Sequence, residues 1–273
     1  MYKPLVSIIC PVWNAEKHIQ STIESILSQT YENIEFVVVD GMSTDKTLSI
    51  INNYKERISH IVSEPDTGMY DALVKGFDLA TGEIICYINA GDYLNAYAIE
   101  VAVSFFSNKH LEWITGLRSV CNENNFITHV DLPFRYKRNL IRSGSYGTSL
   151  PFIQQESTFW RRSLLNKVDY NSLKKLKYAG DYYLWWSFSQ SSNLEVISCQ
   201  LGVFKKHSGQ LSANLNNYYA EMKSFVTGKS LLTYVSETYE LFFWALSPKL
   251  RSFFYKSTYR FNHQTKNWEK STW

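Results

Sequence analysis

The chain has few cysteines, and none of them lie close together. Its 273 residues include only Cys10, Cys86, Cys121 and Cys199, without a C-x-x-C pair. This wide spacing favours neither a disulfide framework nor a zinc site. Cys10 and Cys86 fall in apolar segments expected to be core strands, where a reduced thiol acts as a small hydrophobic side chain. The cysteines therefore indicate a reducing compartment.

Long apolar runs are also missing. No uncharged apolar stretch reaches the roughly 18–20 residues that a membrane-spanning helix needs. No small-residue cleavage site follows the apolar LVSIICPVW, so we interpret this segment as a first core strand rather than a signal peptide. We expect a cytoplasmic protein, or one bound peripherally at the inner face of the plasma membrane.

Charge is sparse and unevenly placed, whereas aromatic residues are abundant. Charged residues make up 19% of the chain and aromatic residues 16%, and the formal net charge is +3. Residues 220–273 hold eight Lys and Arg against four Asp and Glu, so the basic excess lies in the tail. Amphipathic rings favour carbohydrate stacking, interfaces and membrane surfaces. We expect no nucleic-acid partner.

Strand-like and helix-like segments alternate through the first half of the chain. Strands are expected over 5–10, 34–40, 58–63 and 84–89, and helices over 15–29, 45–54 and 69–80. This alternation predicts right-handed βαβ units, and therefore an α/β fold with a mostly parallel sheet flanked by helices. Polar or turn residues end each strand at the same edge, so the four strand ends should form one cleft.

The pattern is looser after about residue 110. We expect a hairpin over 119–132, a mobile basic loop over 133–150 and a helix over 179–190, with a strand and turn over 198–212. The remainder, from residue 214, is expected to be helical and rich in aromatic residues.

The segment IICYINAGDYL, residues 84–94, carries the strongest chemical signal. Its apolar, β-prone run ends in Asn89, Gly91 and Asp92, so a buried strand delivers one carboxylate to the cleft. Such a carboxylate suits a divalent cation that also binds a phosphate ligand. Alternatively, Asp92 caps the helix that follows.

Five motifs stand in the order that resembles the family 2 glycosyltransferases, inverting nucleotide-sugar enzymes of the GT-A fold. They are VSIICPVWNAEKHI, VVVDGMSTDKT, SEPDTGMYDALVKGFDLATGE, NAGD and AGDYYLW. The third is similar to a subgroup that acts in bacterial exopolysaccharide and O-antigen synthesis. The resemblance implies a Rossmann-like GT-A domain over 1–215, with a nucleotide-sugar half (1–110) and an acceptor half (111–215). A helical extension over 216–273 would follow.

The resemblance also implies roles for single residues. Asp181 would be the general base, and Asp92 would hold Mn²⁺ or Mg²⁺ between the two donor phosphates. Trp13 would pack against the base or ribose, and Asp40 would accept hydrogen bonds from the base, most often uracil. The implied nucleotide-sugar contacts are Pro11, Trp13, Asp40, Asp66, Lys75, Asn89 and Asp92.

Other interpretations of these residues stay open from the sequence. Asp40 could be a turn residue, Lys75 could lie on a solvated helix face, and Asp181 could be an N-cap. Many relatives are acidic at the positions of Asn89 and Gly91. Neither residue is acidic here, so the metal site would depend on one carboxylate and the donor phosphates.

The acceptor side is less defined. Gln155, Glu156 and Trp160 are expected to border the acceptor pocket. Trp185 follows Asp181 at a spacing that allows it to stack on a sugar, with core packing as the alternative. His207 is either a contact to the diphosphate or metal, or a structural residue.

The implied reaction is a single in-line displacement at the anomeric carbon, with inversion. A divalent cation stabilises the departing diphosphate as a Lewis acid, and a carboxylate takes the proton of the acceptor hydroxyl. The leading hypothesis is transfer from a UDP-sugar to a lipid-linked or oligosaccharide acceptor in surface polysaccharide synthesis.

Two alternatives to this function remain. One is a catalytically inactive, glycosyltransferase-like assembly module. The other is a nucleotidyltransferase of similar fold, although the Gly-rich basic loop typical of that class is missing after the first strand. The aromatic, basic tail suits a helix on an anionic membrane, a subdomain packed on the core, or a homodimer contact.

Overall fold

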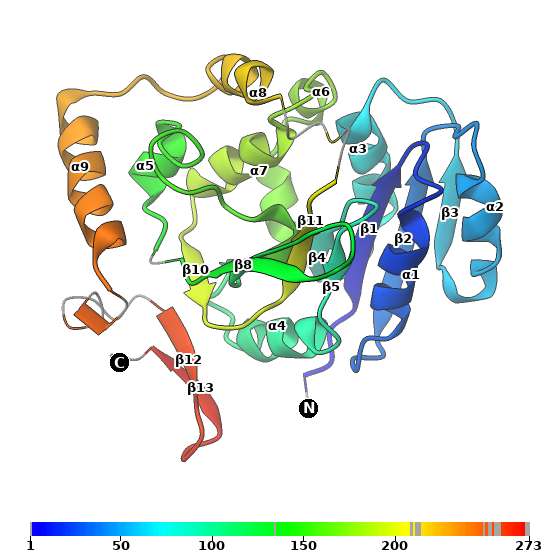
Figure 1. Ribbon diagram of the computed structural model, residues 1–273, viewed down its shortest axis with the longest axis horizontal. Helices are drawn as coiled ribbons and strands as arrows, with labels where there is room; N and C mark the ends of the chain where they lie inside the picture. Colours follow the sequence, from blue (N-terminus) through cyan, green and yellow to red (C-terminus); the bar gives the residue numbers. More distant parts are fainter. Residues whose placement is uncertain are drawn as a thin grey trace.

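A central sheet of nine described strands organises the molecule (Figure 1). The computed structural model describes residues 2–133, 135–207, 210, 214–247, 249–250, 253 and 258–270. The strand order is β13-β12-β10-β6-β9-β4-β1-β2-β3, and five of the eight neighbouring pairs are parallel. The predicted α/β fold with a mostly parallel sheet is therefore confirmed.

The first half of the chain forms the predicted alternation of strands and helices. The strands are β1 (Val6–Val12), β2 (Ile34–Asp40), β3 (His60–Ser63) and β4 (Ile84–Tyr87). The helices are α1 (Ile19–Leu27), α2 (Thr47–Asn52), α3 (Met69–Leu79) and α4 (Ala98–Phe106). Strands β2 and β4 flank β1, and all three run parallel. Their carboxyl ends therefore meet at one edge.

The two faces of the sheet support two hydrophobic layers. Successive residues of a strand point to opposite faces. Accordingly, Ile9 joins the layer that contains α3, whereas Ile8 and Cys10 join the layer that contains α1 and α4. Helix α1 contributes Ile19 and Ile23 at the four-residue spacing of one helix face. Both layers pack against the strands and so fix the positions of the strand ends.

The second half completes the sheet and adds a smaller one. Strand β9 (Thr158–Arg161) is antiparallel to β4 and β6 (Trp113–Thr115), while β10 (Leu194–Ile197) runs parallel to β6. The small sheet has the order β5-β11-β7-β8, with β5 at Tyr93–Leu94 and β11 at Gly202–Lys205. Strands β7 (Arg118–Cys121) and β8 (Ile127–Asp131) form the predicted hairpin. Helices α6 (Tyr170–Leu173) and α7 (Gly180–Ser189) lie between β9 and β10 in the chain.

Two predictions about local structure are wrong. In the described part of residues 133–150, the predicted mobile loop is replaced by helix α5 (Arg138–Arg142) and by side chains such as Leu140 and Tyr146 that are buried in the core. The C-terminal extension is not wholly helical. After α8 (Leu215–Met222) and α9 (Leu231–Ala245), strands β12 (Thr258–Asn262) and β13 (Asn267–Lys270) join the central sheet beside β10.

The tail and the cysteines complete the description. Helix α8 begins at Leu215, next to the predicted boundary, which stays a prediction; half of LRSFFYKSTYRF, residues 250–261, lies outside the described residues. All four cysteines carry free thiols, as predicted. Among the described residues, no helix combines the length and the apolar character that crossing a bilayer requires.

Candidate active site

The turn after β4 places the Asp92 carboxylate inside the protein. Gly91 has φ = 111°, a left-handed conformation that favours glycine, and its N–H donates to Thr22 Oγ1 on α1 at 2.9 Å. Asp92 is only 3% exposed, and its Oδ1 accepts from the Lys205 backbone N–H at 2.8 Å. Burial raises the pKa of Asp92 to about 7. Asp92 caps no helix, so that alternative is excluded.

A second acid, Glu156, is buried beside Asp92. Burial, and then the negative charge of Asp92, raise the pKa of Glu156 well above its usual range. Its Oε1 is buried without a hydrogen-bond partner, and so is Asn89 Oδ1. Asn89 Nδ2 donates to Gln155 Oε1 at 3.1 Å, which ties the turn after β4 to the segment before β9. The structure thus brings Asn89, Asp92, Gln155 and Glu156 together.

Asp181 lies in the first turn of α7. Its Oδ1 accepts a hydrogen bond from the backbone N–H of Tyr182 at 2.7 Å. Ala179 occupies the N-cap position, so Asp181 is not the cap. Burial raises the pKa of Asp181 to about 6, against the lowering effect of its hydrogen bonds. A Cβ at Gly180 would lie 2.5 Å from the Tyr70 ring, so only glycine allows α7 to approach α3 this closely.

Helix α8 holds the segment that carries Asp181. The Tyr218 hydroxyl donates to Asp181 Oδ1 at 3.1 Å. The carboxylate of Glu221 accepts from the backbone N–H groups of Lys177, Tyr178 and Ala179 at 2.6–2.7 Å. These amides lead into α7 and have no partner within that helix. Two side chains of α8 therefore fix both the side chain and the backbone at Asp181.

The Tyr87 hydroxyl connects the two acidic regions. It is buried at the end of β4 and has no hydrogen-bond partner. Burial raises the pKa of Tyr87 well above its usual value, and the negative charges of Asp181, Glu156 and Asp92 add to this effect. All three carboxyl groups thus act on this one buried phenol, and Gln155 Nε2 donates to the Tyr87 carbonyl oxygen at 2.5 Å, which joins the end of β4 to the segment that carries Glu156.

The donor-side residues lie at the ends of β1 and β2. Trp13 follows β1 directly and is 67% exposed. Asp40 is fully buried, and its carboxylate accepts hydrogen bonds from the Ser43 N–H, the Ser43 hydroxyl and the Ser63 hydroxyl at 2.5–3.3 Å. In this structure Asp40 stabilises the turn after β2, and its contact with a base stays a prediction.

Three further donor-side residues surround these turns. Lys75 Nζ lies 2.9 Å from Glu64 Oε1 and donates to Pro65 O at 2.7 Å, so it braces the segment after β3. Burial raises the pKa of Asp66, and the negative charge of Asp40 adds to this rise. Pro11 is buried within β1, and its ring packs inside the protein.

His207 lies beside the Asp92 turn. Its ring stacks on His18, with centroids 4.2 Å apart and an interplanar angle of 21°. His207 Nε2 would be 3.7 Å from a Cβ at Gly91. Burial, followed by the charge of His207, lowers the pKa of His18. Residues 208–209 and 211–212 of the same motif lie outside the described residues.

The predicted acceptor roles of Trp160 and Trp185 are wrong. Trp160 is fully buried in β9 and Trp185 is 1% exposed in α7. Trp185 stacks on Trp113 with centroids 5.8 Å apart, and Trp160 meets Tyr87 edge-on at 6.3 Å. Aromatic packing in the core therefore occupies both indoles. Trp160 contacts the site through the ring of Tyr87.

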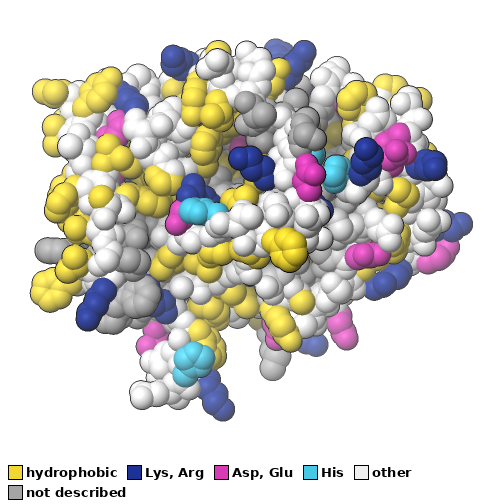
Figure 2. Space-filling model, viewed as in Figure 1, with side chains coloured by type: hydrophobic (Ala, Val, Ile, Leu, Met, Phe, Trp, Pro, Cys, Tyr) yellow, Lys and Arg dark blue, Asp and Glu magenta, His cyan; other side chains and the backbone are white. Residues whose placement is uncertain are grey.

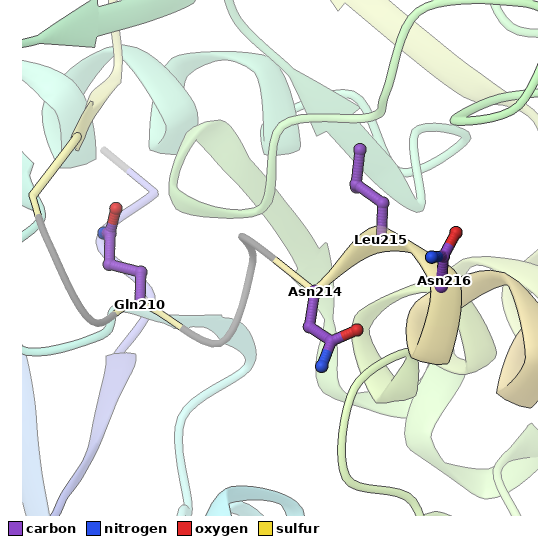
Figure 3. A pocket seen from close by; sticks show the side chains of 4 residues that line it. All are labelled: Gln210, Asn214, Leu215 and Asn216. Atoms are coloured by element: carbon purple, nitrogen blue, oxygen red, sulfur yellow. The ribbon is translucent and has the colours of Figure 1, made fainter.

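A pocket of about 350 Å³ opens at the start of α8 (Figure 3). The described residues that line it are Gln210, Asn214, Leu215 and Asn216. Its lining residue Asn214 lies four residues before Tyr218, whose hydroxyl donates to Asp181. Its amide groups are suited to hydrogen bonds with sugar hydroxyls.

The acidic region fits a hard divalent cation. Buried oxygens without partners are costly, and Asn89 Oδ1 and Glu156 Oε1 are two such atoms near the Asp92 carboxylate. Mn²⁺ and Mg²⁺ prefer oxygen ligands of this type. Among the described residues, no group of three His, Cys, Asp or Glu side chains forms a complete metal site. Donor phosphates would therefore have to supply further ligands.

Sequence reasoning missed four residues of this site, namely Tyr70, Tyr87, Tyr218 and Glu221. The alternation along the strand before Asn89 could have shown Tyr87, because residues two apart share a strand face. Tyr218 and Glu221 give no local signal, since their contacts cross 37 to 44 residues of chain.

Comparison with known proteins defines the class of the molecule. The solved structures most informative here are Staphylococcus aureus TarS 1–349 with UDP-GlcNAc and the Pyrobaculum calidifontis mannosyltransferase PcManGT with GDP-Man and Mn²⁺. Their TM-scores are 0.64 and 0.62, each at 19% identity, and the matches cover 81% and 92% of this chain. The chain spans 65% of TarS 1–349 and 72% of PcManGT. The fold is that of the GT-A glycosyltransferases.

The sequence comparisons identify the family. The model of glycosyl transferase family 2 matches residues 7–169. Escherichia coli WfgD, a UDP-Glc:alpha-D-GlcNAc-diphosphoundecaprenol beta-1,3-glucosyltransferase, is 28% identical over 216 residues, which are 78% of this chain and 81% of WfgD. A Mycobacterium tuberculosis PGL/p-HBAD biosynthesis glycosyltransferase is 39% identical over 114 residues, 40% of this chain and 44% of that protein. The chain belongs to glycosyl transferase family 2 and is a glycosyltransferase.

Proposed function

We propose that this enzyme transfers a sugar, with inversion, from a UDP-sugar to a lipid-linked or oligosaccharide acceptor in bacterial surface polysaccharide synthesis. The observation that carries the proposal is the burial of Asp92 and Glu156 after β4, together with Asp181, whose side chain and preceding backbone are held by Tyr218 and Glu221. A base and a phosphate-binding region within one cleft are what a displacement at an anomeric carbon requires. UDP is supported by the donor of WfgD and by the UDP-GlcNAc bound to TarS.

Asp181 is the general base in this proposal. A pKa of about 6 leaves its carboxylate mostly ionised at neutral pH, yet makes it a stronger base than an ordinary aspartate. Tyr218 engages Oδ1, which orients the carboxylate while Oδ2 takes the proton of the acceptor hydroxyl. Such proton transfer contributes roughly 10²–10⁴-fold to the rate.

Asp92 and Asn89 would hold Mn²⁺ or Mg²⁺, with Glu156 as a further oxygen in reach of Asp92. When bound, the cation supplies Lewis-acid stabilisation of the departing diphosphate. Asp92 must be ionised to serve as a ligand, so its pKa of about 7 makes ligation favourable above that pH. Trp13 packs against the nucleoside, and His207 contacts the diphosphate.

The lipid-linked acceptor is supported by the diphosphoundecaprenol substrate that the name of WfgD gives. The pocket at Gln210 and Asn214 lies next to the helix that contacts Asp181, so it offers a place for the acceptor sugar.

A screen of UDP- and GDP-sugars tests the function. Each donor is incubated with Mn²⁺ and a polyprenyl-diphosphate-linked sugar, and the released nucleotide and glycosylated lipid are measured. We expect product with a UDP-sugar. An inactive assembly module would release no nucleotide from any donor, whereas a nucleotidyltransferase would instead consume a nucleoside triphosphate and a sugar phosphate.

A further inference from the structure

Helix α9 directs apolar side chains outward. Leu231 and Leu232 are each 80% exposed, Val235 is 61% exposed and Phe242 is 60% exposed. At 100° per residue these side chains share one outer face with Thr238. No residue on that face is charged. In Figure 2, hydrophobic side chains gather along the side of the molecule where Figure 1 places α9.

The acidic side chains of α9 point the other way. Glu240 is fully buried, with its carboxylate bound by Arg135 and 2.7 Å from Lys137 Nζ. Glu237 is 5% exposed and lies 2.9 Å from Lys229 Nζ. A helix on a water-exposed surface shows the opposite pattern, with its apolar stripe towards the core. The outer face of α9 is therefore built for a non-aqueous neighbour.

The exposed charges of the described C-terminal extension are complementary to an anionic surface. In the described part of residues 214–270, the exposed side chains of Asp, Glu, Lys and Arg are all lysines, namely Lys223, Lys249, Lys266 and Lys270. The glutamates of the same part are buried or half-buried, and each accepts a hydrogen bond or forms an ion pair. They are Glu221, Glu237, Glu240 and Glu269.

We propose that the outer face of α9 binds an anionic lipid bilayer surface. Apolar side chains that enter the interface, together with lysines that attract anionic head groups, provide the two contributions needed for stable peripheral binding. The proposal goes beyond the proposed function and does not depend on it, because membrane binding requires neither donor nor acceptor.

A second copy of the chain fits this face less well. A 15-residue helix is about 22 Å long and about 10 Å wide, so its footprint is roughly 220 Å². A standard protein interface buries about 800 Å² on each partner. A lipid surface needs no matching protein patch of that size, and it supplies charge opposite to that of the exposed lysines of the extension.

The position of α9 also relates the membrane to the active site. Helices α8 and α9 belong to the same extension, and α8 supplies Tyr218 and Glu221 to the Asp181 segment. Binding through α9 would therefore anchor the part of the chain that holds the general base at the surface where lipid-linked sugars reside.

Vesicle flotation tests the proposal. The full chain is mixed, without donor or acceptor, with vesicles of phosphatidylcholine alone or with one third phosphatidylglycerol, in low and high salt. We expect flotation with the anionic vesicles that weakens in high salt. Val235→Glu and Phe242→Glu should each reduce the bound fraction at least about tenfold, because each places a charge in the apolar contact.

Phe126→Glu is the matched control. Phe126 is 67% exposed in the β7–β8 hairpin, so this variant has the same chemical change away from α9 and should float like the unaltered chain. An unchanged melting temperature establishes that a variant folds. If Val235→Glu does not fold, Val235→Gln is measured in its place. Failure of the unaltered chain to float, or normal flotation of the α9 variants, would overturn the proposal. A dimer that Phe242→Glu dissociates would show instead that α9 contacts a second copy.

Discussion

At the scale of residues, burial controls the chemistry of the site. Asp181 and Asp92 are carboxyl groups whose pKa values rise to about 6 and about 7 because protein replaces the water around them. Two donors, the Tyr182 backbone N–H and the Tyr218 hydroxyl, stabilise the ionised form of Asp181 against this effect of burial. Of these two, Tyr218 lies outside the family motifs quoted above.

Tyr218→Phe should move the acidic limb of the pH–rate profile upward. The base must be ionised, so the rate falls as pH drops through the pKa of Asp181. Loss of the Tyr218 hydrogen bond raises that pKa, so activity should decline at a higher pH, by up to about one unit. The measurement is the pH profile of kcat. Tyr219→Phe removes a neighbouring hydroxyl and is expected to leave the profile unchanged. An unshifted limb in Tyr218→Phe would contradict the assignment.

The residue scale also shows where the sequence misleads. Trp160 and Trp185 have the composition of sugar-stacking residues, yet both are core side chains. The segment around each tryptophan is rich in aromatic residues, so its pattern does not reveal which face is buried. The sequence predicts the role of Asp181 from the order of whole motifs, and that of Asp92 from the end of its strand as well, because either residue alone could equally be a helix cap.

At the scale of elements, α8 acts as a brace for α7. The Glu221 carboxylate accepts from three consecutive amides that lead into α7, in the way that capping side chains satisfy the unpaired amides of a helix start. This contact joins the C-terminal extension to the rest of the protein next to Asp181, the proposed base.

Glu221→Gln should lower kcat more than it changes KM for the donor. Glutamine has one acceptor oxygen, so the amides before α7 lose partners and Asp181 is held less firmly. We expect a fall in kcat of about tenfold and a loss of roughly 1 kcal/mol of stability. Steady-state kinetics and thermal unfolding measure both effects. Glu269→Gln, in β13, is the control and should leave kcat unchanged. A normal kcat in Glu221→Gln would exclude the brace.

Glu240→Gln should destabilise the packing of α9. The change leaves Arg135 and Lys137 without their buried carboxylate. Both cations are partly exposed and regain some hydration, so we expect a loss of about 2 kcal/mol, less than for a fully buried pair. Glu237→Gln removes a carboxylate that meets one lysine and should cost less. Chemical denaturation measures both variants, and equal stability of Glu240→Gln and the unaltered chain would contradict this account of α9.

The elements differ in how far the sequence predicts them. Strands β1, β2 and β4 and the helices between them follow from regular alternation of apolar segments. Strands β12 and β13 do not, because segments of five and four residues are too short to show a regular pattern. Strand β12 pairs with β10, more than 60 residues earlier in the chain, and β13 pairs with β12.

At the scale of the whole molecule, the fold joins the proposed nucleotide-binding edge, the proposed base and an outward apolar helix in one chain. The parallel order of β4, β1 and β2 brings the donor-side turns to one edge. The antiparallel strand β9 then places Glu156 beside Asp92. The alternation of strands and helices along the sequence predicted the first arrangement. The second depends on pairing between distant strands, which local patterns do not encode.

Asp92→Asn should remove the metal-dependent part of nucleotide binding. Calorimetry of UDP with and without Mn²⁺ gives the two affinities for each protein. In the unaltered chain we expect Mn²⁺ to tighten UDP binding, and more strongly at pH 8 than at pH 6, because ligation requires the ionised form of Asp92. In Asp92→Asn the effect of Mn²⁺ should fall about tenfold or more. Full retention of the Mn²⁺ effect would show that Asp92 is not a ligand.

The most direct test of the central claim separates donor binding from sugar transfer in Asp181→Asn. Calorimetry measures its affinity for the UDP-sugar donor that the screen identifies, and a transfer assay with the lipid-linked acceptor measures its rate. Loss of the base should reduce kcat by roughly 10²–10⁴-fold while donor affinity stays close to that of the unaltered chain, since proton transfer belongs to the transition state. Near-normal transfer by Asp181→Asn would contradict the account.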